Sequence, residues 1–106
     1  MAAQLSAKNF KKEVLESKQP VMVDFFASWC GPCKMMLPIV DELAKEMEKQ
    51  IKIFKVSIEE DEDLASQYGV MSIPTFLFFK NGKVIDQAGG GMSKENLVKI
   101  IKKAIK

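Results

Sequence analysis

The sequence predicts a single α/β domain over residues 1–106, in which a central mixed β-sheet lies between two layers of helices. The first observation is length, because 106 residues is a usual size for one domain and too short for two cores. The second is that strand patterns alternate with helix patterns along most of the chain, which is typical of parallel strands joined by crossover helices. The third is Asn81-Gly82, a two-residue hairpin turn that adds an antiparallel section to the same sheet.

The expected strands, in chain order, cover residues 2–5, 21–27, 51–58, 75–79 and 84–88. The first is a weak edge strand. The second is an apolar run interrupted only by Asp24, as in strands that are buried on both faces. The third alternates between apolar and polar residues, which is the period of a strand. The fourth opens after Pro74, which suits the start of a strand because proline cannot donate to a ladder, and the hairpin turn leads into the fifth.

The expected helices cover residues 6–17, a segment that begins at Pro32, residues 64–68 and residues 94–105. Three of them repeat apolar residues at helical spacing, namely Phe10, Val14 and Leu15, then Met36, Val40, Leu43 and Met47, then Leu97, Ile101, Ala104 and Ile105. Pro38 lies inside the second helix and predicts a kink, because it removes a backbone donor and clashes with the preceding turn. Gly69 closes the third helix, and Ser93 caps the last.

Composition excludes several classes of function. All 16 basic residues are lysines, and against 14 acids they leave a net charge of +2, so we expect no nucleic-acid partner. The chain has no histidine, which removes histidine-dependent triads and almost every catalytic zinc site. No apolar run approaches the roughly 20 residues of a membrane span, and the first residues lack a secretory signal. We therefore expect a cytoplasmic protein that makes no membrane contact.

The two cysteines carry the strongest chemical signal. They lie three positions apart in WCGPCK, residues 29–34, and chance would give that spacing roughly once in fifty. The segment joins the second strand to the second helix, and the first turn of a helix stabilises a thiolate. Cys30 precedes the helix on an exposed turn and is the expected nucleophile, whereas Cys33 turns inward and is the expected resolving thiol. An inert bridge, or half of a zinc site shared by two chains, are the alternatives.

Asp24 is a second anomaly, because a carboxylate in an apolar strand is costly to desolvate and its pKa should rise. It could accept the proton of Cys33, since no histidine can do so; the alternative is a solvated acid at the end of a strand. Lys55 is its natural companion, because it alternates with Ile51 and Ile53, although the same pattern also fits a surface lysine. Ile73-Pro74 opens the fourth strand, and by itself such a bond is more often trans than cis.

Taken together, these motifs resemble the thioredoxin family over nearly all of residues 5–106. The shared features are the WCGPCK segment after a V-D-F strand, Pro38 in the helix, I-P-T before the fourth strand, F-K-N-G at the hairpin and a glycine before the last helix. Gly-Pro between the cysteines separates this family from related oxidants and isomerases, which usually carry other dipeptides there. The resemblance implies the thioredoxin fold.

The resemblance also implies a general protein dithiol-disulfide oxidoreductase. Cys30 would attack a target disulfide, Cys33 would resolve the mixed disulfide, and the proton would be managed by Asp24 with Lys55. The substrate groove would be lined by Trp29, Gly31, Pro32, Ile73, a cis Pro74 and Gly90. The backbone of Ile73 would pair with the substrate like an added strand, which explains broad specificity.

For cofactors and partners, the resemblance implies a Cys30-Cys33 redox disulfide with no bound cofactor or metal. A separate flavin-dependent thioredoxin reductase, drawing on NADPH, would regenerate the dithiol. The other partners would be disulfide-containing target proteins, and the chain itself is expected to be a monomer.

Several positions depart from the family pattern. Phe26 stands where a tryptophan is common, Glu59 stands where aspartate is usual, and residues 89–91 are all glycine, which should flatten one wall of the groove. Two other functions stay open at this point. One is an oxidant or isomerase, which the reduction potential would reveal. The other is a binding module that uses the Trp29/Pro74 groove without redox turnover.

Overall fold

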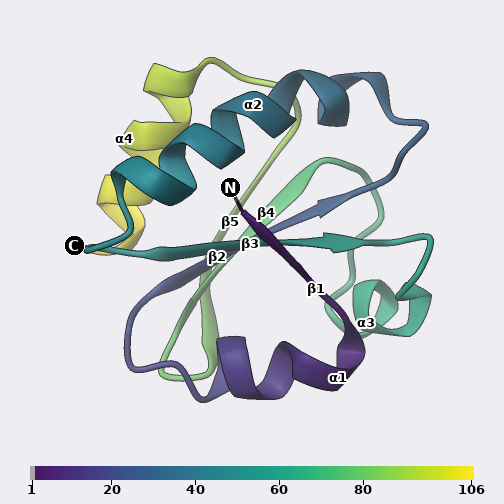
Figure 1. Ribbon diagram of the computed structural model, residues 1–106, viewed down its shortest axis with the longest axis horizontal. Coiled ribbons are helices and arrows are strands. Elements are labelled where there is room, and N and C mark those ends of the chain that lie inside the picture. The colour runs from purple at the N-terminus through teal and green to yellow at the C-terminus, as the bar shows by residue number, and fades with distance from the viewer. Residues whose placement is uncertain (1) are drawn as a thin grey trace.

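A mixed sheet forms the centre of the protein in the computed structural model, which describes residues 2–106 (Figure 1). Within that range the strands are β1 (Ala3–Leu5), β2 (Val21–Phe26), β3 (Lys52–Ser57), β4 (Thr75–Lys80) and β5 (Lys83–Gly89). Their order across the sheet is β1-β3-β2-β4-β5. The pairs β1–β3 and β2–β3 are parallel, whereas β2–β4 and β4–β5 are antiparallel. The predicted strands and the mixed sheet are confirmed.

Helices cover both faces of this sheet, so the predicted three layers are confirmed. The helical segments are α1 (Ala7–Phe10) with its continuation η1 (Lys11–Leu15), α2 (Gly31–Glu46), α3 (Glu62–Gln67) and α4 (Lys94–Ala104). Figure 1 shows α2 and α4 on one side of the sheet and α1 and α3 on the other. Pro38 lies inside α2, and the Ser93 hydroxyl caps α4 by accepting from the Asn96 N–H at 3.1 Å.

The helix predicted over residues 6–17 needs one correction, because its second half is a π-helix. The Glu16 N–H donates to the Lys11 carbonyl at 2.9 Å, a bond that spans five residues instead of four. Val14 is buried and Leu15 packs beside it against the same core cluster. Tertiary packing sets this wider turn, and local helix propensity does not report it.

Strand β2 is buried on both faces, as its apolar run predicts. Val21, Val23 and Phe25 join the core between the sheet and the α1/α3 layer. Met22 points the other way and joins the core beneath α2 and α4. Side chains alternate along a strand, so Asp24 faces the α2 side with Met22.

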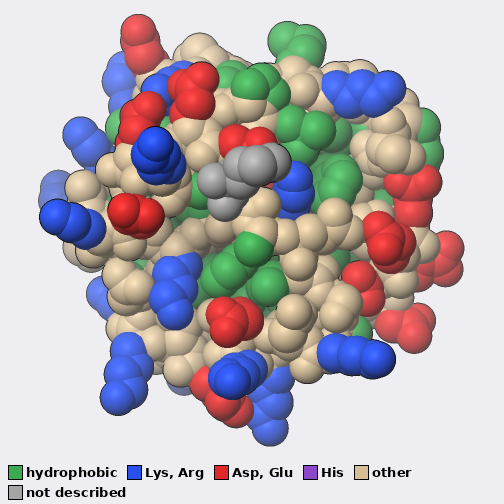
Figure 2. Space-filling model, in the orientation of Figure 1, with side chains coloured by type: hydrophobic (Ala, Val, Ile, Leu, Met, Phe, Trp, Pro, Cys, Tyr) green, Lys and Arg blue, Asp and Glu red, His purple; other side chains and the backbone are tan. Residues whose placement is uncertain are grey.

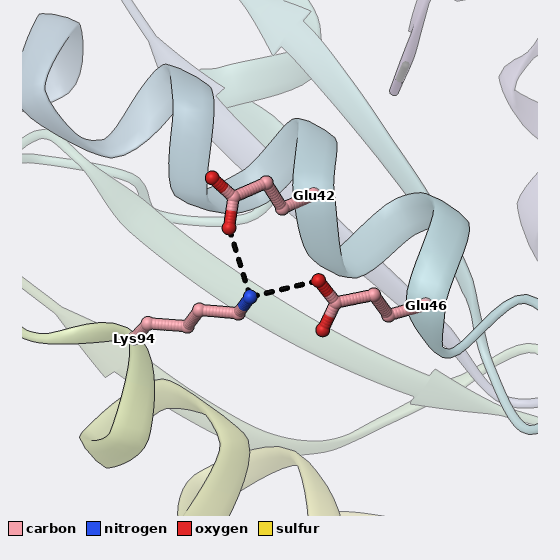
Figure 3. A network of polar contacts seen from close by, with 3 residues as sticks. All are labelled: Glu42, Glu46 and Lys94. Atoms are coloured by element: carbon pink, nitrogen blue, oxygen red, sulfur yellow. Dashed lines mark hydrogen bonds and ion pairs between the residues drawn. The ribbon is translucent and has the colours of Figure 1, made fainter.

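The surface is charged, and one ion-pair network ties two helices together. Lys94, at the start of α4, donates to Glu42 and Glu46 of α2, each at 2.8 Å (Figure 3). Acidic side chains gather along the edge of the molecule beside α3 (Figure 2). Among the helices of residues 2–106, none is long and apolar enough to cross a membrane.

Candidate active site

Both cysteines lie where the loop after β2 leads into the first turn of α2. Cys30 is the N-cap residue of α2, and Cys33 lies in the first turn. They form a disulfide with their Cα atoms 5.2 Å apart. The Cys33 N–H donates to the Cys30 sulfur at 3.1 Å, so an otherwise unpaired donor of the helix start points at the sulfur. In the reduced protein, the same donor and the helix dipole stabilise a thiolate on Cys30.

The expectation that Cys30 lies exposed on the turn is wrong, because its side chain is almost completely buried. Trp29 is 68% exposed, but Cys30 itself is only 5% exposed and Cys33 only 1%. The reason is packing, since both sulfurs belong to a small cluster that includes Ala27 and Ile73. Cys30 is still the more accessible of the two, which is the order that the predicted roles require.

The segment before β4 brings a second wall to the disulfide. The Ile73-Pro74 bond is cis, which confirms that prediction. The Ile73 carbonyl oxygen lies 3.9 Å from the Cys30 sulfur. Within residues 2–106 the Ile73 N–H makes no hydrogen bond, so its backbone is free to pair with another chain.

The three consecutive glycines, residues 89–91, lie beside Pro74 and Pro32. The Gly90 N–H donates to the Pro74 carbonyl at 2.9 Å, and Gly90 has a φ of 87° that favours glycine. A Cβ on Gly91 would lie 3.7 Å from the Pro32 Cβ. The glycine run therefore lies against both the Pro74 turn and Pro32 at the start of α2.

Asp24 is fully buried, so the solvated alternative is excluded. Neither carboxylate oxygen has a hydrogen-bond partner within the described part of the chain. Desolvation raises the pKa of Asp24 from 3.8 to about 7, while the charge of Lys55 pulls it down and that of Asp41 pushes it up. The group can therefore gain or lose a proton near neutral pH.

Lys55 lies beside Asp24 in the sheet but does not pair with it. The two residues are register partners on β3 and β2. The Lys55 Nζ lies 5.9 Å from the centroid of the Phe26 ring, a cation–π position, and within residues 2–106 it forms no ion pair with Asp24. The strand register thus confirms that Lys55 is a neighbour of Asp24. The Lys55 ammonium, however, faces the ring of Phe26, the residue that stands where the family commonly has tryptophan.

Three features at this end of the molecule were missed by the sequence reasoning. Met35 and Met71 are exposed, and Met35 lies one helical turn beyond Gly31, on the same face of α2. Glu59 accepts hydrogen bonds from the backbone N–H of Ser28 at 2.7 Å and from its hydroxyl at 3.2 Å. The departure from the usual aspartate at position 59 was the one signal in the sequence that pointed to this contact.

The described residues hold no cluster of three or more His, Cys, Asp or Glu side chains that a metal ion would need. The chemistry of the site is that of its sulfur atoms. A disulfide at a helix start, next to an unpaired backbone segment, together with a buried acid on the strand that leads to it, is the arrangement of a protein dithiol-disulfide oxidoreductase.

Comparison with known proteins agrees with that class. The thioredoxin family model matches residues 1–103. A thioredoxin of Rickettsia felis is 49% identical over 105 residues, which cover 99% of this chain and all of the relative. Thioredoxin 1 of Nostoc sp. is 48% identical over 96% of this chain and 95% of the relative, and Thioredoxin 1 of Synechococcus elongatus is 47% identical over 97% and 96%. The chain belongs to the thioredoxin family, and it is a protein-disulfide reductase that works through the Cys30-Cys33 pair.

Proposed function

We propose that Cys30 is the nucleophile and Cys33 the resolving thiol of a two-step exchange. The Cys30 thiolate attacks one sulfur of a target disulfide, forms a mixed disulfide and releases the first target thiolate. The Cys33 thiolate then attacks the Cys30 sulfur, which forms the Cys30-Cys33 disulfide and releases the second target thiolate. Two electrons pass to the target, and both released thiolates take up protons. The observation that carries this assignment is the helix N–H on the Cys30 sulfur, which favours ionisation of that cysteine.

Asp24 is the proposed proton acceptor for Cys33. Cys33 is almost completely buried, so water has little access to its thiol. Asp24 faces the same side of the sheet and has a pKa of about 7, close to the pH at which it would act. Lys55 acts on this acid through its charge, because it opposes the rise in the Asp24 pKa.

The groove around the disulfide is the proposed docking site for target proteins. Trp29, Gly31 and Pro32 form one side of it. Ile73, Pro74 and Gly90 form the other. The unpaired Ile73 N–H supports docking of an extended target segment as an added strand, in which backbone bonds hold the target and few side chains are read.

Each turnover leaves the protein as a disulfide, so a second protein has to return two electrons. Membership of the thioredoxin family supports a flavin-dependent reductase that draws on NADPH as that donor. We also propose a monomer that works in electron transport and redox homeostasis of the cytoplasm, where thiols are kept reduced. Nucleic acid and membranes are not among its proposed partners.

The reduction potential of the Cys30/Cys33 couple tests this function. Trp29, the single tryptophan, gives a fluorescence signal beside the disulfide for titration against a thiol buffer. We expect a potential near the value of about −270 mV that characterises thioredoxin itself. A potential above about −200 mV would instead indicate an oxidant or isomerase. A double Cys30→Ser, Cys33→Ser variant that kept full function in a target assay would show a binding module.

A further inference from the structure

The turn that carries Trp29 and Cys30 leaves one backbone donor to be satisfied from outside. The Cys30 N–H donates to the Ala27 carbonyl at 3.2 Å and closes a four-residue turn. In such a turn the N–H of the second residue has no partner inside the turn. That donor belongs to Ser28, and a backbone N–H seldom goes without a partner in a folded protein.

The sheet does not supply the missing acceptor, but the chain just after β3 does. The last rung between the two chain segments is the bond from the Ile58 N–H to the Phe26 carbonyl, at 2.9 Å. A further parallel rung would run from the Ser28 N–H to the Ile58 carbonyl. The Glu59 carboxylate takes that place, with one oxygen 2.7 Å from the Ser28 nitrogen and the other 3.2 Å from its hydroxyl.

The contact between Glu59 and Ser28 should persist near neutral pH. Both bonds end on one carboxylate, and charge-assisted bonds of this kind are stronger than neutral ones. The bond from the Ser28 N–H, followed by that from its hydroxyl, holds the pKa of Glu59 below its ordinary value. The carboxylate is therefore ionised throughout the neutral range.

We propose that Glu59 is a positioning residue for protein-disulfide reduction. Its hydrogen bonds from Ser28 hold the turn that carries Trp29, and so fix the side of the docking groove that Trp29 forms. This inference rests on the groove described under the proposed function. Glu59 makes no hydrogen bond to either sulfur, whereas Ser28 directly precedes Trp29 in the turn. The carboxylate therefore acts on how a target docks, and the reactivity of the Cys30 thiolate is set by the helix start.

The test compares two substrates in three variants of the full chain. Glu59→Ala removes the acceptor, whereas Glu59→Gln removes the charge and keeps an oxygen that can accept from the Ser28 N–H. Glu60→Ala is the matched control, because Glu60 is also exposed and its carboxylate binds the Gln4 side chain instead, at 2.9 Å. The substrates are insulin, a protein disulfide that has to dock, and a small aromatic disulfide that needs no groove.

We expect Glu59→Ala to lower kcat/KM for insulin by about threefold to tenfold, because both bonds to Ser28 are lost but water can replace part of them at this exposed position. Its rate with the small disulfide should change by less than about twofold. Glu59→Gln should recover most of the insulin activity, and Glu60→Ala should match the wild type on both substrates. Urea unfolding of each variant shows that the comparison is made between folded proteins.

Three results would overturn the inference. Equal losses on both substrates would place the effect in the thiol chemistry or the fold. Unchanged insulin kinetics in Glu59→Ala would show that the turn holds without Glu59, and an equal loss in Glu60→Ala would make it an effect of surface charge. A wild-type protein that failed to reduce insulin would instead refute the proposed function, so the two failures are distinguishable.

Discussion

Replacing Asp24 by Asn should stabilise the protein at alkaline pH and change little near pH 4. The acid binds its proton more tightly in the folded chain than in the unfolded one, because its pKa rises from 3.8 to about 7 on burial. The free energy of unfolding therefore falls as the pH rises from about 4 to about 7, and the loss is complete above pH 7. At about 1.4 kcal/mol per pKa unit, the ionised carboxylate costs about 4 kcal/mol. Asparagine has nearly the same shape and never carries that charge.

The assay is urea unfolding of the disulfide form at pH 4, 6 and 8, followed by Trp29 fluorescence. The variant should be more stable than the wild type by about 4 kcal/mol at pH 8, by less at pH 6 and by close to zero at pH 4. Asp63→Asn is the control, because the same chemical change is made there on an exposed side chain of α3. A gain from Asp24→Asn that was equal at all three pH values would refute the reasoning, since it could not come from ionisation.

Four further outcomes follow from the site and the core. Asp24→Asn should slow resolution of the mixed disulfide near neutral pH more than the first attack by Cys30, measured by rapid mixing; equal slowing of both steps would contradict the role as acceptor. Cys33→Ser should accumulate the mixed disulfide with a target, detected by mass. Gly90→Ala should cost about 1 kcal/mol in urea unfolding because of its positive φ, whereas Gly91→Ala should cost little, since the new Cβ would make an ordinary contact. Leu97→Ala, at a fully buried position of α4, should cost about 3 kcal/mol, and a cost below about 1 kcal/mol would mean that α4 repacks.

Most of the fold could be predicted because its local signals agree with one another. The apolar run of β2 is interrupted once, the apolar repeat of α2 from Met36 to Met47 spans about three turns, and Asn81-Gly82 sets the hairpin. The second half of the first helix could not be predicted, because a π turn depends on how residues 11–15 pack against the finished core. Helix propensities describe the α-helix and give no sign of where a rare π turn will form.

The candidate site likewise contains some features that the sequence predicts and others that it does not. The proposed roles of Cys30 and Asp24 follow from local pattern, because the cysteine spacing marks one residue and the apolar strand around it marks the other. The contact between Glu59 and Ser28 spans 31 positions and depends on where β2 and β3 end relative to each other, which no local pattern reports. Lys55 lies between these cases, since its place in the register was predictable and the turn of its ammonium toward Phe26 was not.

The stability that ionised Asp24 costs the fold and the basicity that its proposed role as proton acceptor requires come from the same free energy. The chain has no histidine, and in the proposed mechanism a carboxylate takes the proton of a thiol whose ordinary pKa is about 8.5. For an acid of pKa 3.8 that transfer is uphill by about 6 kcal/mol, and for one of pKa about 7 it is uphill by only about 2 kcal/mol. The difference of about 4 kcal/mol equals the stability that the ionised acid removes from the folded protein. A variant that solvated Asp24 would therefore gain stability and lose basicity together, and neither change could be had without the other.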